Sequence, residues 1–445
     1  MSRFLAAAIA VAFVPVAGAG AQVSTPATPR VGSPTATPRA GPPAPLPSAN
    51  LPVLVPRSGP LPSSLTLVQA LEEAEARSPA VLAARARVEA ASARIGQAGL
   101  RSNPELSVEV ENFLGTGDLA GLRATETTVA VNQRLDLGGR RRARVTAAQA
   151  ALTAERIRLS IARADLAQSV REQFARAIVA RDRLRLAEDN NERARELARI
   201  AQILVDNGRE PPLRALRARS AATQAAADLE AARAEERSSR ATLVSLFGVT
   251  DPVQSLSGGL IDLTPRLVNP GISLEVRLAE AERLVAEATL RQEQAASRLD
   301  PAVGLGIRHV REAGAVALVG GVSLPLPVFD RNRGNIEAAR AGIRSAEANL
   351  ANIRASVQVR AANAVTNVQS ATTRVEALER SAIPEATEAL RLSRLAYIQG
   401  RASLVELLDA QSAYREAQAA LIDARLAQAL ATAELGRVAA QQDPQ

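Results

Sequence analysis

An irregular segment that occurs twice constrains the fold of this chain more than any other feature. The two copies span residues 131–145 and 322–336, and they align without a gap at a shift of 322 − 131 = 191 positions. In each copy an alternating apolar run ends and a long, charged helical pattern begins. A chain that repeats its most irregular segment is built from two similar halves, each with its own strand-to-helix junction.

Upstream of each junction, the sequence predicts a pair of amphipathic β-strands. Larger side chains that can face lipid recur at alternate positions in four runs, and in the first half the positions between them are mostly polar. The runs contain Leu106, Val108 and Val110; Thr127, Val129 and Val131; Val303, Leu305 and Ile307; and Val316, Leu318 and Val322. Strands that are apolar on one face suit the wall of a transmembrane barrel, although these runs carry almost none of its usual aromatic residues beyond Phe113. Because about eight strands are the usual minimum for closure, the four strands of this chain need further copies.

Downstream of each junction, the sequence predicts a very long helix. Apolar residues recur every seven positions in both halves, at Val145, Leu152, Leu159 and Leu166, and at Ile336, Ile343, Leu350 and Val357. This spacing is typical of a coiled-coil seam. We expect the first helix to span residues 140–206, which is roughly 100 Å of helix. We expect Pro384 to kink the second long helix.

Each long helix is expected to end at a glycine, Gly208 in the first half and Gly400 in the second. Glycine readily adopts the left-handed conformation that terminates helices. Pro211 and Pro212 fit the first turn of the helix that returns. Each half therefore reads as helix, β-hairpin, very long helix, tight turn and return helix, and the fold class is mainly α with a small β part.

The start of the chain and the segment between the halves have the composition of processing and linker sequences. A positive start, an apolar run and small residues up to Ala21 predict a secretory signal peptide. Because no cysteine follows, we expect no N-terminal lipid anchor. The expected division is a signal peptide at 1–21, a proline-rich disordered linker at 22–62, a first repeat at 63–250, an inter-repeat linker at 251–271, a second repeat at 272–440 and a tail at 441–445.

Charge and rare residue types exclude several functions. The chain has 54 Lys and Arg residues against 46 Asp and Glu residues, a net charge of +8. We interpret the arginines as solvated helix faces and predict no nucleic-acid partner, because a signal peptide and acidic strand faces argue against one. The single histidine, His309, and the lack of cysteine leave no catalytic or metal-ligating set. We therefore predict no enzyme, no cofactor and no metal site.

Two motifs give the chain a family resemblance. Residues 325–334 read Pro-Leu-Pro-Val-Phe-Asp-Arg-Asn-Arg-Gly, and residues 397–411 read Tyr-Ile-Gln-Gly-Arg-Ala-Ser-Leu-Val-Glu-Leu-Leu-Asp-Ala-Gln. With the twofold repeat, they make residues 65–440 similar to the TolC-like outer membrane efflux proteins. The first motif resembles the branch that includes heavy-metal efflux channels.

The resemblance implies a homotrimer in the outer membrane that extends into the periplasm. Three chains of four strands would form a 12-stranded transmembrane β-barrel, continued by a periplasmic α-helical barrel. The implied partners are a periplasmic membrane-fusion adaptor protein, an inner-membrane efflux pump and outer membrane lipid. The implied function is a passive exit duct for substrates that the pump delivers through the adaptor, with metal cations as one candidate cargo.

The resemblance also assigns the helix–turn–helix tips. It places Tyr397, Glu406 and Asp409 at the periplasmic aperture, and Gly208, Arg209, Gly400, Arg401 and Ser403 at tips that contact the adaptor. Arg214 stands near the position where the resemblance implies an acidic partner for Tyr397. Glu406 and Asp409 are three positions apart and share a helix face, so three copies would form acidic rings that attract cations. The alternative, that both are ordinary solvent-facing helix carboxylates, stays open here.

A structural coiled-coil protein of the surface or periplasm is the alternative function. It predicts continuous heptads and no amphipathic hairpins. The strands upstream of both junctions favour the channel.

Overall fold

The computed structural model describes residues 57, 59–249, 253, 255–259 and 269–440. The predicted signal peptide, nearly all of the predicted proline-rich linker and the predicted tail lie outside the described residues. The described residues all belong to one unit, Leu54–Gln445.

The two halves contain the same order of long elements. The first half contains β1 (Ser64–Leu65), α1 (Leu67–Arg77), α2 (Pro79–Ala98), β2 (Glu105–Glu111), η1 (Gly117–Leu119), β3 (Glu126–Arg134), α3 (Arg140–Asp206) and α4 (Pro212–Ser245). The second half contains β4 (Ser255–Leu256), η2 (Pro270–Ile272), α5 (Leu274–Ala296), β5 (Ala302–Val310), β6 (Ala315–Ser323), α6 (Arg333–Ala377), η3 (Leu378–Ala382), α7 (Ile383–Ile398) and α8 (Leu404–Val438). The predicted hairpins and the predicted 140–206 helix are confirmed.

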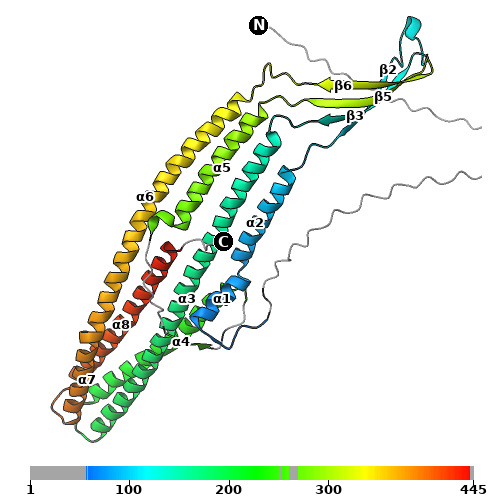
Figure 1. Ribbon diagram of the computed structural model, residues 1–445. Coiled ribbons are helices and arrows are strands. Elements are labelled where there is room, and N and C mark those ends of the chain that lie inside the picture. The colour runs from blue at the N-terminus through cyan, green and yellow to red at the C-terminus, as the bar shows by residue number, and fades with distance from the viewer. Residues whose placement is uncertain (1–56, 58, 250–252, 254, 260–268, 441–445) are drawn as a thin grey trace, which may run out of the picture. The chain divides into compact units, whose positions relative to one another are not determined.

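The four long strands form one antiparallel sheet in the order β2-β3-β5-β6 (Figure 1). The register sets apolar residues side by side across the strands, as in the row Val108, Val129, Ile307 and Leu318. These four side chains are 62, 43, 56 and 83% exposed, so the residues that the structure describes leave this sheet face open. β2 and β6 form the two edges of the sheet.

The opposite sheet face carries the charged side chains, because successive residues of a strand point to opposite sides. Arg308 of β5 forms ion pairs with Glu111 of β2 (3.2 Å) and Glu126 of β3 (3.0 Å). Its Nε also donates a hydrogen bond to the Thr128 hydroxyl (3.0 Å). One arginine therefore connects three strands across the polar face.

Both long helices begin at a residue in the left-handed conformation, Gly139 (φ 76°) before α3 and Asn332 (φ 56°) before α6. α3 contacts α2, α4, α5 and α8 along its 67 residues. Of the predicted heptad residues, Leu152, Leu350 and Val357 are buried. None of the described helices has a stretch long and apolar enough to cross a lipid bilayer.

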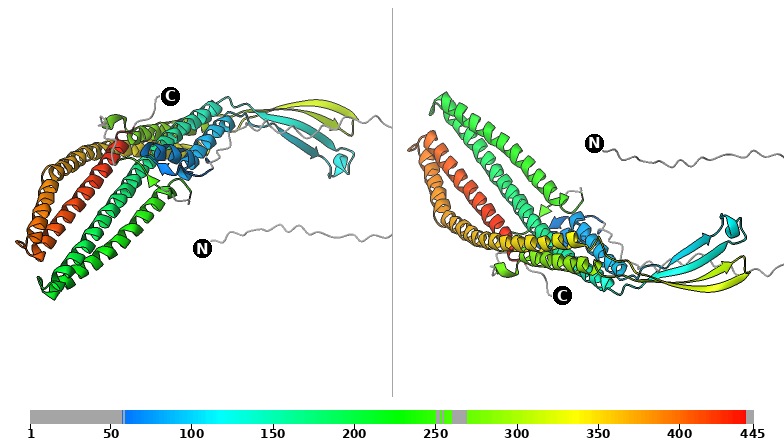
Figure 2. Two further views of the ribbon diagram at one scale, coloured as in Figure 1. Left: turned by 90° about the horizontal axis from the view of Figure 1, so that it is seen from below. Right: turned by 90° about the horizontal axis from the view of Figure 1, so that it is seen from above.

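The second long helix is interrupted by a π-helical turn, η3, directly before Pro384. Proline has no backbone N–H and its ring crowds the preceding turn, so the helical hydrogen-bond ladder widens there. Figure 2 shows the bend where α6 passes into α7. The predicted kink is confirmed.

The sequence did not predict the short parallel strand pair β1 and β4, in which Leu65 lies opposite Leu256. Both leucines join a buried cluster with Phe174 of α3 and with Phe247 and Val253. Part of the segment expected to be a linker, residues 251–271, therefore contributes to the core. The pair joins the start of the first half to the segment that directly follows that half.

Candidate functional site at the helical tips

The turn between α3 and α4 is closed by two backbone hydrogen bonds. The N–H of Arg209 donates to the carbonyl of Leu204 (2.9 Å), and the N–H of Gly208 donates to the carbonyl of Val205 (2.9 Å). Gly208 has a φ of 70°. This is the Schellman geometry, which satisfies the last carbonyls of a helix and requires a left-handed residue after it.

The turn between α7 and α8 has the same geometry. The N–H of Arg401 donates to the carbonyl of Ala396 (2.8 Å), and the N–H of Gly400 donates to the carbonyl of Tyr397 (3.0 Å). Gly400 has a φ of 69°. The two glycines and two arginines of the tips are exposed, and Ser403 is half-buried.

The second tip differs from the first in how its return helix begins. The Ser403 hydroxyl accepts a hydrogen bond from the N–H of Glu406 (3.3 Å), and the Glu406 carboxylate accepts one from the N–H of Ser403 (2.7 Å). This capping box uses one carboxylate oxygen of Glu406. Glu406 and Asp409 are both exposed on α8.

Tyr397 lies between the two tips. Its side chain is 6% exposed, and its hydroxyl has no hydrogen-bond partner among the described residues. Burial raises the pKa of Tyr397; the negative charge of Glu210 raises it further, and the positive charge of Arg214 opposes both. Arg214 is itself paired with Glu210. The tyrosine therefore faces an acid–base pair on the first tip.

A buried apolar cluster joins the two helix pairs beside Tyr397. Leu197 of α3, Leu390 of α7, and Leu404 and Leu407 of α8 are its other large members. Each is at most 8% exposed. This cluster packs the α7–α8 pair against the α3–α4 pair behind the tips.

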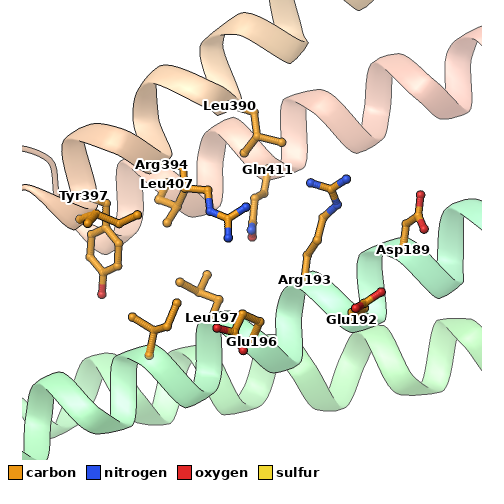
Figure 3. A pocket seen from close by; sticks show the side chains of 12 residues that line it. Asp189, Glu192, Arg193, Glu196, Leu197, Leu390, Arg394, Tyr397, Leu407 and Gln411 are labelled. Carbon is orange, nitrogen blue, oxygen red and sulfur yellow. The ribbon is translucent and has the colours of Figure 1, made fainter.

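Next to this cluster lies a groove of about 350 Å³ between α3 and the α7–α8 pair (Figure 3). Its lining combines apolar, acidic and basic residues, namely Asp189, Glu192, Arg193, Glu196, Leu197, Ile200, Leu390, Arg394, Tyr397, Ile398, Leu407 and Gln411. Figure 3 shows Arg193 and Arg394 reaching into the groove from opposite sides. The groove has an apolar base and a charged rim.

The charges on the rim are partly paired. Arg199 donates to both carboxylate oxygens of Glu196 (2.7 and 2.9 Å), and these bonds, with a smaller effect of Arg394, lower the pKa of Glu196. The Arg193 guanidinium lies 5.8 Å from the centre of the Tyr414 ring, a distance that permits a cation–π contact. The Glu196 carboxylate therefore stays ionised at neutral pH.

The structure places both Arg214 and Glu210 near Tyr397, so an acidic group does lie close to the tyrosine. Glu210 lies in the turn between α3 and α4, whereas Arg214 lies on the return helix α4. The Ser-x-x-Glu spacing at Ser403 and Glu406 is the sequence signal for the capping box. The groove could not be foreseen, because it depends on how two helix pairs pack together.

An antiparallel sheet with one apolar open face, joined to paired long helices that end in two Schellman turns, defines a channel subunit with a β-barrel part and an α-helical part. The chain belongs to the outer membrane efflux protein family, whose model matches residues 70–249 and 272–441. It is therefore an outer membrane channel subunit of an efflux system. The family and the solved structures it resembles are channel proteins.

The relatives include metal-resistance proteins. The chain is 31% identical over 304 residues to the nickel-cobalt-cadmium resistance protein NccC of Alcaligenes xylosoxydans xylosoxydans, covering 67% of this chain and 69% of that protein. It is 29% identical over 356 residues to the cobalt-zinc-cadmium resistance protein CzcC of Cupriavidus metallidurans, covering 78% of this chain and 83% of CzcC.

Solved structures share the fold. The outer membrane protein VceC of Vibrio cholerae matches with a TM-score of 0.71 at 22% identity, covering 84% of this chain and 96% of VceC. CusC matches with a TM-score of 0.73 at 18% identity, covering 84% of this chain and 92% of CusC. Among the described residues of the present chain, no group of three or more His, Cys, Asp or Glu side chains could hold a metal ion.

Proposed function

We propose that three copies of this chain form a closed duct that carries divalent metal cations out through the outer membrane. The observation that carries the proposal is the four-stranded sheet, with an exposed apolar face and two long edge strands, β2 and β6. An apolar face is costly in water and favourable in lipid, whereas unpaired strand edges are costly in lipid, and closure into a barrel removes those edges. Three sheets of four strands give twelve, within the range of membrane barrels.

The tips and the groove beside them are the proposed contact surface for a periplasmic adaptor. The tip residues Gly208, Arg209, Gly400 and Arg401 are exposed. The groove offers an apolar base for the side chains of a helical hairpin and a charged rim for its polar residues. An inner-membrane pump would deliver cargo through that adaptor.

Two features support metal cations as the cargo. NccC and CzcC are named for resistance to nickel, cobalt, zinc and cadmium. Glu406 and Asp409 are exposed on one face of α8, and three copies would set their carboxylates around the aperture. Acidic rings raise the local concentration of cations without holding them, which suits a passive duct.

The test is metal tolerance in the native host. Deletion of the gene is expected to lower tolerance to nickel, cobalt, zinc or cadmium and to leave tolerance to a panel of drugs unchanged. A deletion strain that loses only drug tolerance would contradict the metal cargo. Unchanged tolerance to both classes would contradict efflux by this chain.

Complementation tests the acidic ring. Glu406→Gln combined with Asp409→Asn removes both charges and keeps the capping box, because glutamine also serves at that position. We expect this double variant to restore tolerance only in part. Glu235→Gln, at an exposed carboxylate in the middle of α4, is the matched control and should restore it fully. Full rescue by the double variant would remove the ring from the mechanism.

A further inference from the structure

The loop between β6 and α6, residues 324–332, exposes apolar side chains that the described part of the chain leaves uncovered. We call it the junction loop. Leu326 is 70% exposed, Val328 is 61% exposed and Phe329 is 100% exposed. Such side chains in contact with water are unfavourable, by an amount proportional to their apolar area. A contiguous group of three marks an interaction surface.

The junction loop continues the apolar face of the sheet. Val316, Leu318 and Val322 lie on the exposed apolar face of β6, and the same alternation leads through Leu324 to Leu326. Residues 324–327 form no strand pairs, since prolines at 325 and 327 lack the N–H that a ladder needs, and the N–H of Val328 donates to the carbonyl of Leu326 (2.9 Å) in a tight turn. The face that would meet lipid in a barrel therefore extends beyond the last paired strand residue.

The base of the junction loop is fixed while its apolar part is free. The Nδ2 of Asn332 donates to the backbone carbonyl of Glu293 (2.9 Å) and to the Glu293 carboxylate (2.8 Å) at the end of α5. The Asp330 carboxylate accepts a hydrogen bond from the N–H of Asn332 (2.9 Å). These bonds hold the loop in place without covering Phe329.

The equivalent arginines of the two junctions differ in what they bind. Arg140 of the first junction uses its guanidinium within the chain, on Asp300 and on three backbone carbonyls. Within the described ranges, the guanidinium of Arg331, its counterpart at the 191-residue shift, donates one hydrogen bond, to the carbonyl of Pro327 (3.3 Å). Arg331 and Arg333 are exposed and form no ion pair within the described residues. Two exposed cations therefore flank the apolar side chains of the second junction, and one of them, Arg331, lacks among the described residues the carboxylate partner that Arg140 has at the first junction.

We propose that the junction loop inserts into the inner leaflet of the outer membrane. Leu326, Val328 and Phe329 would enter the boundary between headgroups and acyl chains, and Arg331 and Arg333 would bind lipid phosphates. Apolar side chains beside arginines are typical of segments that lie in this boundary. The inference rests on the proposed barrel, and it assigns to one loop the anchoring that aromatic girdles supply in other barrels.

The chain contains no tryptophan, so one substitution supplies a specific fluorescent probe. Phe329→Trp places an indole in the junction loop, at a site so exposed that folding is not disturbed. The trimer would be purified and reconstituted into phosphatidylethanolamine–phosphatidylglycerol vesicles with or without brominated acyl chains. Leu213→Trp, at a 58% exposed site in the first turn of α4, is the matched control in the aqueous tip.

Brominated lipid is expected to quench the tryptophan at 329 several-fold more strongly than the tryptophan at 213, with a blue-shifted emission at 329 only. Arg331→Gln with Arg333→Gln in the same background is expected to reduce that quenching, and unchanged quenching would overturn the role given to the arginines. A blue-shifted but unquenched probe would show that a neighbouring copy covers the loop, and a solvent-like probe would show that nothing does. Either result in an intact trimer overturns the inference alone, whereas failure to form a trimer overturns the proposed function.

Discussion

Arg140 holds the first strand-to-helix junction together, and its removal should destabilise the assembled channel. The guanidinium contacts the Asp300 carboxylate at 3.2 Å and the backbone carbonyls of Ala295, Ala296 and Arg298 at 3.3, 2.7 and 2.6 Å. The Asp300 side chain is 10% exposed, so Arg140→Ala leaves a largely buried carboxylate without its partner.

The cost can be estimated from these contacts. A hydrogen bond to a charged group contributes about 1.5–3 kcal/mol. Because the Arg140 side chain is 29% exposed, water can replace some of its hydrogen bonds when the junction opens. We therefore expect Arg140→Ala to lower the stability of the junction by about 3 kcal/mol. If these bonds break before the rate-limiting step, the trimer should dissociate roughly 150-fold faster. Arg331→Ala removes a single bond to the Pro327 carbonyl and should cost under about 0.5 kcal/mol.

The assay is the rate at which the trimer band disappears on electrophoresis of detergent-purified protein held at one elevated temperature. Detergent removes the lipid contacts proposed for Arg331, so that variant is a matched control at the equivalent repeat position. Equal rates for the two variants, or an Arg140→Ala rate like that of the parent, would refute the reasoning.

Three further perturbations follow from the geometry. Gly208→Ala or Gly400→Ala puts a methyl group on a residue with a φ near +70°, so we expect the local free energy of unfolding to fall by about 1 kcal/mol and the amides of that tip to exchange faster. As a control, Gly436→Ala within α8 should stabilise the helix. Tyr397→Phe removes a buried hydroxyl without a partner and should not destabilise the protein. Burial raises the pKa of Tyr397 above its usual 10.0, so the stability that the neutral tyrosine contributes is complete below pH 10.0 and is lost as the pH rises toward the pKa of the folded state. Thermal unfolding between about pH 8 and 11 should show this loss in the parent and not in Tyr397→Phe. Phe174→Ala should cost about 3–5 kcal/mol by opening a cavity beside the β1–β4 pair, measured as loss of heat-resistant trimer.

The long elements could be predicted because each one depends on local pattern. Alternation defined the four strands, and the heptad spacing with Gly208 gave the 67 residues of α3. The kink before Pro384 follows from the chemistry of proline alone. Because the halves repeat at a shift of 191 residues, the elements predicted in one half are expected again in the other.

The features that were not predicted depend on contacts between distant segments. β1 and β4 have two residues each, too short for any periodic signal, and they pair across the whole first half. Arg140 and Arg331 align in sequence, yet only the packing of α5 and β5 gives Arg140 its partners. The neighbourhood of Tyr397 with Glu210 likewise depends on how the two tips come together.

The central claim is that three copies close one barrel through their edge strands, and disulfide cross-linking in isolated outer membranes tests it most directly. The chain has no cysteine of its own. A cysteine at Val108 on β2 would be paired in turn with one at Val316, Leu318 or Val322 on β6, and each single-cysteine chain is the control. For at least one pair, oxidation should give covalent dimers and trimers and nothing larger. The claim is contradicted if no register cross-links, or if the products extend beyond the trimer.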